Sequence, residues 1–198
     1  MKIRKVTQGN QALVLGGGGA TGNAWSIGVI AGLFDAGLDV RRADLIIGTS
    51  AGATVAAQVC STMQPPELFY SGVDLADAVA ASTAGGFAYS IGGSQYIDGG
   101  YRSDVNADLA TGYQRILVIA PLGIQTRKPL EWRLHLNAQI NELRARGSLV
   151  ETILPDSESQ NAIGIGMDLM DLSGRRSSAQ AGYNQGKAFA EQSTEFWC

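Results

Sequence analysis

Apolar residues along the chain fall into two patterns, short continuous runs and longer segments with helical spacing. The continuous runs each end near a Gly or a Pro, as is typical of strands buried in a parallel sheet. They are Ala12–Leu15, Leu45–Gly48, Ile116–Ala120 and Leu149–Leu154. The pattern therefore predicts four strands, and segments of a different periodicity separate them.

The intervening segments predict helices. They are 23–36, Ala51–Cys60, Val73–Ala81, Val105–Leu109, Leu130–Arg146 and Ser177–Phe196. Gly37 and Gly147 follow two of them, at the place of a C-terminal cap. The alternation of strands and helices predicts an α/β fold with a mostly parallel sheet. No repeat or linker divides the sequence, so we expect one domain over residues 1–198.

A hairpin interrupts this alternation in the middle of the chain. Phe87–Ile91 and Ser94–Ile97 flank Gly92-Gly93, and a Gly-Gly pair is typical of a tight hairpin turn. Pro65-Pro66, further upstream, is expected to break regular structure.

Composition excludes several classes of protein. The net charge is −3 and no Lys/Arg cluster accompanies aromatic residues, so a nucleic-acid partner is not expected. Cys60 and Cys198 are too few for a disulfide scaffold or a cysteine metal site, and reduced thiols are expected. No run approaches the roughly 20 apolar residues of a membrane-spanning helix, and the basic N-terminus lacks a signal-peptide core. We expect a soluble, cytoplasmic protein.

The first motif with chemical meaning is Gly48-Thr49-Ser50-Ala51-Gly52, a G-x-S-x-G sequence between a predicted strand and a predicted helix. This is the context of a nucleophile elbow, a sharp turn that presents a serine hydroxyl at a helix N-terminus. Gly48 and Gly52 are expected because side chains there would collide with the neighbouring strand and helix. Ser50 is therefore a candidate nucleophile.

The second motif is the glycine-rich segment 16–22, which follows the first strand. Backbone amides of Gly17, Gly18 and Gly19 are candidates for an oxyanion hole, because residues without Cβ atoms allow close approach of a substrate. The segment also fits a dinucleotide-binding G-x-G-x-x-G, but no acidic residue follows the second strand to hold a ribose. A phosphate-binding Walker loop fails because Asn23 stands where that motif has Lys.

A third motif, Asp98-Gly99-Gly100, supplies a candidate base. A serine needs a group that accepts its proton, which is usually a histidine. The one histidine, His135, lies inside the predicted helix Leu130–Arg146, and a structural role is expected for it. Asp98 closes a predicted strand and precedes two glycines, so it is the better candidate.

The three motifs in this order resemble the patatin-like phospholipase family. The resemblance implies a three-layer α/β/α fold and a Ser–Asp dyad, here Ser50 and Asp98, that cleaves carboxylic esters of lipids without a metal or an organic cofactor. It also implies a small ester or lipid as substrate. Transient contact with a membrane or micelle and formation of a homodimer are both compatible with the sequence. Trp25 and Trp132 lie in predicted helices with apolar neighbours and are expected in the core.

Two departures from the family bear on function. Thr21 stands where the family usually has Arg or Lys, and the stretch between Ser50 and Asp98 is much shorter than in relatives. A shorter stretch implies a smaller, more open acyl pocket, so we expect an esterase that favours short acyl chains. The alternative is a catalytically inactive patatin-like protein with a binding or scaffold role.

Overall fold

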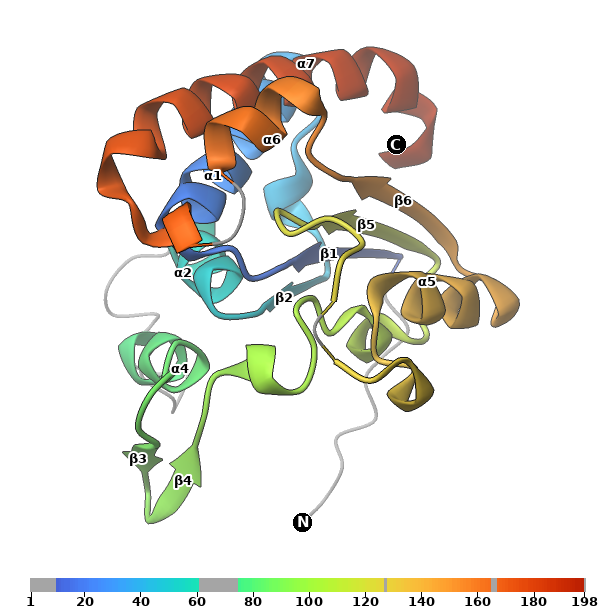
Figure 1. Ribbon diagram of the computed structural model, residues 1–198. Helices are drawn as coiled ribbons and strands as arrows, with labels where there is room; N and C mark the ends of the chain where they lie inside the picture. The colour runs from blue at the N-terminus through green and yellow to red at the C-terminus, as the bar shows by residue number, and fades with distance from the viewer. Residues whose placement is uncertain (1–9, 61–74, 127, 165–166, 198) are drawn as a thin grey trace.

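A computed structural model describes residues 10–60, 75–126, 128–164 and 167–197; for residues 75, 167, 168 and 194 it describes the backbone only. Its centre is a four-stranded parallel sheet in the order β2-β1-β5-β6 (Figure 1). The strands are β1 (Gln11–Leu15), β2 (Leu45–Gly48), β5 (Arg115–Ile119) and β6 (Leu149–Ile153). All four agree with the predicted apolar runs to within one residue at each end.

The register aligns the carboxyl ends of the strands at one edge of the sheet. Leu15 at the end of β1 pairs with Gly48 of β2 on one side and with Ile119 of β5 on the other. The glycine-rich segment and the serine elbow directly follow β1 and β2. They therefore emerge at the same edge, where ligands of open α/β sheets bind.

Alternate residues of the central strands face two separate cores. Leu13, Leu15, Leu117 and Ile119 belong to one cluster with α1 (Gly19–Asp35), α2 (Ala51–Cys60), α6 (Ser157–Ile163) and α7 (Arg175–Trp197). Ala12, Val14, Ile116 and Val118 belong to the other, with α5 (Leu136–Ala145) and a 3-10 helix at Ala107–Ala110. The strands are thus buried on both faces, and the predicted three-layer α/β/α architecture is confirmed (Figure 1).

Helix α7 packs on α1 through glycines. A Cβ atom on Gly28 or Gly32 of α1 would collide with backbone carbonyl oxygens of α7, and one on Gly182 or Gly186 of α7 would collide with carbonyls of α1. The missing side chains allow the two backbones to approach closely. This contact fixes α1, whose first turn is part of the glycine-rich segment.

Three predicted helices differ from the observed ones. In place of the predicted helix Val105–Leu109 there is the 3-10 helix Ala107–Ala110, because Asn106 is left-handed with a φ of 55°. α1 begins at Gly19 and not at residue 23, so half of the predicted glycine loop is the first turn of a helix. The predicted helix Leu130–Arg146 is broken at Arg133, whose φ of 54° is left-handed, and α5 begins only at Leu136. The apolar spacing continues across Arg133, so the pattern could not show the break.

The smaller elements agree more closely with expectation. The hairpin consists of β3 (Tyr89–Ile91) and β4 (Ser94–Tyr96), and Gly92 and Gly93 have φ values of 55° and 82°. Such a pair of positive φ angles is what a type I′ turn requires. Preceding it is α4 (Leu75–Ser82), near the predicted 73–81, whereas Pro65-Pro66 lies outside the described residues.

One observed α-helix has no counterpart among the predicted ones. α6 was not predicted; Asp156 caps it by accepting a hydrogen bond from the Ser159 amide at 2.8 Å. Of the helices in the described part of the chain, none has the length and hydropathy needed to cross a membrane.

Candidate active site

Ser50 lies in a strained turn between β2 and α2. Its φ of 51° is in the left-handed region, which residues with a side chain rarely adopt. Its amide donates a hydrogen bond to Ser82 Oγ at 3.0 Å, a contact from α4 that no sequence pattern indicated. The turn places Ser50 directly before the N-terminus of α2, whose dipole favours negative charge there.

The two glycines of the elbow are required by contacts between backbones. A Cβ on Gly48 would lie 2.5 Å from Ala53 Cα, and one on Gly52 would overlap the carbonyl group of Leu15. The steric role expected for both glycines is therefore present in the structure. Since the obstructing atoms belong to the backbone of β1 and α2, rotation of a side chain cannot relieve the overlap.

Replacement of Gly52 with Ala should destabilise the fold. The new methyl group would push α2 away from β1, at a cost of about 3 kcal/mol, the upper range for overpacking. In a chain of this size that corresponds to a melting temperature lower by roughly 6–12 °C. Thermal unfolding followed by circular dichroism measures the effect. Gly86→Ala is the matched control, because a Cβ at Gly86 would meet no atom within 4 Å; an equal loss in both variants would contradict the steric explanation.

The glycine-rich segment offers fewer free amides than the sequence indicated. The Gly17 amide donates to the Asp104 carbonyl oxygen at 2.8 Å, so in this structure it is already occupied and is not free to bind an oxyanion. Among the hydrogen bonds of the described residues, none involves the amides of Gly18 and Gly19. Gly19, with φ of 62°, begins α1, so both amides lie at a helix N-terminus, where anions are favoured.

Asp98 directly follows the hairpin and begins the 3-10 turn Gly99–Tyr101. Its Oδ1 accepts a hydrogen bond from the Gly100 amide at 2.6 Å, and its own amide donates to the Ala84 carbonyl at 3.1 Å. A Cβ on Gly100 would stand 2.9 Å from Asp98 Oδ1, so glycine at this position keeps space for the carboxylate. These contacts hold the carboxylate in one orientation.

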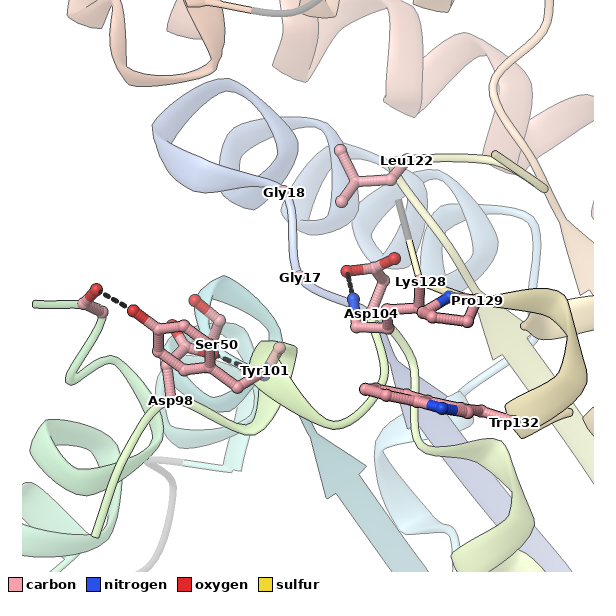
Figure 2. A pocket seen from close by; sticks show the side chains of 12 residues that line it. Gly17, Gly18, Ser50, Asp98, Tyr101, Asp104, Leu122, Lys128, Pro129 and Trp132 are labelled. Atoms are coloured by element: carbon pink, nitrogen blue, oxygen red, sulfur yellow. Dashed lines mark hydrogen bonds and ion pairs between the residues drawn. The ribbon is translucent and has the colours of Figure 1, made fainter. Parts of the chain in front are cut away.

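Ser50, Asp98 and Gly18 line one cavity of about 600 Å³, although they come from three distant parts of the sequence. This volume suits a small ligand. Figure 2 shows two groups of side chains across this cavity. Ser50, Asp98 and Tyr101 lie on one side, and Leu122, Lys128, Pro129 and Trp132 on the other.

The position of Trp132 differs from the one expected from the sequence. It was expected in the core, but it is 56% exposed and lines the cavity, whereas Trp25 is fully buried as expected. Because the helix is broken at Arg133, Trp132 belongs to a separate short turn at the cavity wall. This position was not apparent from the helical spacing.

An ion pair in the same cavity supports the glycine-rich segment. Lys128 Nζ lies 2.7 Å from Asp104 Oδ1, and the Lys128 side chain is only 14% exposed. The Asp104 carbonyl in turn holds the Gly17 amide. Thr21, at the position where the family has a cation, is buried in α1 and donates to the Leu169 carbonyl at 3.3 Å. Lys128 therefore supplies a cation near the segment from elsewhere in the chain.

A buried polar network connects the serine elbow with the Asp98 loop. Asn106 Nδ2 donates to Thr49 Oγ1 at 3.0 Å and to the Gly99 carbonyl at 3.3 Å. Thr49 Oγ1 donates to the Val105 carbonyl at 3.1 Å. Asn106 is 5% exposed and has a φ of 55°. One amide group thus bridges the residue before Ser50 and the residue after Asp98.

Arg102 completes this network from the surface. It donates to Asn106 Oδ1 at 2.6 Å and pairs with Asp108 at 2.6 Å. The hydrogen bonds that Arg102 donates to the Asp108 carboxylate raise the pKa of Arg102, so the guanidinium stays charged. Arg102 therefore orients the Asn106 amide with its NH₂ group toward Thr49 and Gly99.

His135 lies apart from the cavity. It is the half-buried residue before the first turn of α5, not a residue in mid-helix, and it is not among the residues that line the cavity. This agrees with a structural role.

The described part of the chain offers neither a cluster of metal ligands nor an activated thiol. Among the described residues, no group of three His, Cys, Asp or Glu side chains is placed to hold a metal ion. Burial raises the pKa of the Cys60 thiol.

Comparison with known proteins identifies the N-terminal part of the chain. None of the curated proteins matches the chain. Residues 13–71 match the family model for patatin-like phospholipases, a stretch that contains the glycine-rich segment and the elbow but not Asp98. This stretch covers less than half of the chain, and over it the sequence is similar to patatin-like phospholipases.

Proposed function

We propose that the protein is a serine esterase that cleaves carboxylic esters through Ser50 and Asp98. The observation that carries this proposal is the single cavity lined by the strained serine, the oriented carboxylate and the glycine-rich segment. Strained backbone at a cavity is typical of a functional residue. The patatin-like match adds the class of substrate, a lipid ester.

The reaction proceeds in two halves. Ser50 Oγ attacks the ester carbonyl carbon while Asp98 takes the hydroxyl proton. The amides of Gly18 and Gly19 stabilise the oxyanion of the tetrahedral intermediate. The carbon–oxygen bond to the alcohol then breaks, and Asp98 returns the proton to the leaving alcohol.

Water completes the cycle. A water molecule attacks the acyl-enzyme and gives one proton to Asp98, and the bond between the acyl carbon and Ser50 Oγ breaks. Asp98 then returns the proton to Ser50, and the carboxylic acid is released. Donors at the oxyanion contribute about a hundred- to thousandfold each in comparable enzymes.

A second candidate function is a patatin-like binding protein without turnover. Among the hydrogen bonds of the described residues, none joins the Ser50 hydroxyl to Asp98, which favours this alternative. Hydrogen bonds between catalytic groups are often long before a substrate binds, so the geometry is also compatible with an enzyme. Covalent labelling of Ser50 by a fluorophosphonate distinguishes the two functions, because only an activated serine reacts.

We expect a preference for short acyl chains. The cavity has a partly exposed wall, with Tyr101 57% and Trp132 56% exposed, so the distal methylenes of a long chain would remain in water. Each buried methylene contributes about 0.8 kcal/mol, and methylenes outside the cavity contribute nothing. Accordingly, kcat/KM for p-nitrophenyl butyrate should exceed that for p-nitrophenyl palmitate, measured under conditions that keep both esters dispersed. A strong preference for palmitate would contradict the open-cavity argument.

A further inference from the structure

A second, mainly apolar cavity lies next to the cavity that Ser50 and Asp98 line, which we call the ester cavity. Its volume is about 370 Å³, and it lies beyond the carboxyl ends of β5 and β6, beside α6. Ile124, Leu154, Ile163 and Leu169 contribute most of its apolar side chains. The described residues that line it carry no charge. Such a cavity suits an alkyl chain better than a polar ligand.

Leu122 is the one described residue that lines both cavities. Its neighbour Pro121 packs against the glycine-rich segment, since a Cβ on Gly18 would lie 2.8 Å from Pro121 Cβ. In Figure 2, Leu122 lies on the Gly18 side of the ester cavity. The partition between the cavities therefore adjoins the amide that would hold the oxyanion.

This arrangement limits where an acyl chain can go. In the proposed function the carbonyl oxygen points to Gly18 and Gly19, and Pro121 packs against Gly18. An acyl chain that leaves the carbonyl carbon on this side of the cavity meets Leu122. A short chain fits in front of the half-buried Leu122 side chain. A longer chain would need the space that this side chain occupies, and beyond that space lies the apolar cavity.

We infer that Leu122 sets the acyl-chain length the enzyme accepts, and that the apolar cavity behind it is a distal acyl subsite. This inference rests on the proposed function. It assigns a ligand class, the end of a saturated acyl chain, to a cavity that the catalytic proposal does not use.

The test compares chain-length profiles of Leu122 variants. Leu122→Ala should raise the ratio of kcat/KM for p-nitrophenyl octanoate over butyrate by about tenfold or more, because each newly buried methylene contributes roughly fourfold. Leu122→Phe should lower the same ratio. Adding Gln160→Trp to Leu122→Ala should cancel the gain, since Gln160 lines only the apolar cavity and is exposed.

Leu149→Ala is the matched control, because Leu149 is 60% exposed and lines neither cavity. An unchanged octanoate-to-butyrate ratio in both Leu122 variants, with normal hydrolysis of butyrate, would overturn the inference and leave the proposed function intact. If the octanoate-to-butyrate ratio of Leu122→Ala stays raised after Gln160→Trp is added, the apolar cavity is not the acyl subsite. Failure of the wild type to hydrolyse any ester or to react with a fluorophosphonate would overturn both proposals.

Discussion

Ester hydrolysis should fall by roughly 10⁴-fold or more when Ser50 is replaced with Ala, because the variant has no nucleophile to form an acyl-enzyme. Asp98→Asn should lower kcat to a similar extent, since an amide cannot accept the serine proton. The measurement is the rate of p-nitrophenyl butyrate hydrolysis by the wild type and both variants, together with covalent labelling by a fluorophosphonate. Labelling should occur at Ser50 and disappear in Ser50→Ala.

Ser177→Ala and Asp171→Asn are the controls, because both residues are exposed and neither lines the cavity of Ser50 and Asp98. They should retain the wild-type rate. Full activity in Ser50→Ala would eliminate the proposed mechanism. A wild-type protein that is folded, as shown by cooperative thermal unfolding, yet neither labelled nor active would favour the non-catalytic binding protein.

The second large effect is expected at Asn106. Asn106→Asp keeps the size of the side chain and tolerates the left-handed backbone, but it replaces the NH₂ group that joins Thr49 to Gly99. The elbow and the Asp98 loop would lose their common partner, and small displacements of catalytic groups cost about a hundredfold. We expect kcat to fall by about 10- to 100-fold with little change in KM, and fluorophosphonate labelling to slow in parallel.

Two comparisons separate this positioning role from a general loss of stability. Asn184→Asp makes the same chemical change at an exposed position of α7 and should leave kcat unchanged. Thr49→Val should resemble Asn106→Asp, whereas Thr49→Ser, which keeps the hydroxyl, should restore most of the rate. Equal changes of KM and kcat in Asn106→Asp, or a rate of Thr49→Ser as low as that of Thr49→Val, would argue against a positioning role for the hydrogen bonds of Asn106.

The parts of the fold and site that could be predicted are those fixed by local sequence. Short apolar runs that end in Gly or Pro gave the four strands, because burial on both faces of a sheet demands continuous apolar residues. The elbow could be located because its G-x-S-x-G pattern lies between a strand and a helix; Gly48 relieves a contact with the nearby Ala53, whereas the contact of Gly52 with the distant Leu15 is evident only in the structure. The Gly92-Gly93 turn was predictable for the same local reason.

What the sequence did not predict depends on contacts between distant segments. The Gly17 amide is occupied because Asp104, far along the chain, places its carbonyl there. Asn106 carries no motif of its own, and its role arises only when the elbow and the Asp98 loop meet. The break at Arg133, which brings Trp132 to the cavity, interrupts an apolar spacing that otherwise continues.

The left-handed backbone of Ser50 has a thermodynamic consequence. A side chain held at this φ costs on the order of 1–2 kcal/mol, which a glycine at the same place would not incur. A protein in which position 50 served only to turn the chain would gain stability by exchanging serine for glycine. A serine at this position therefore lowers the free energy of unfolding relative to glycine, as is typical of strained residues at functional sites.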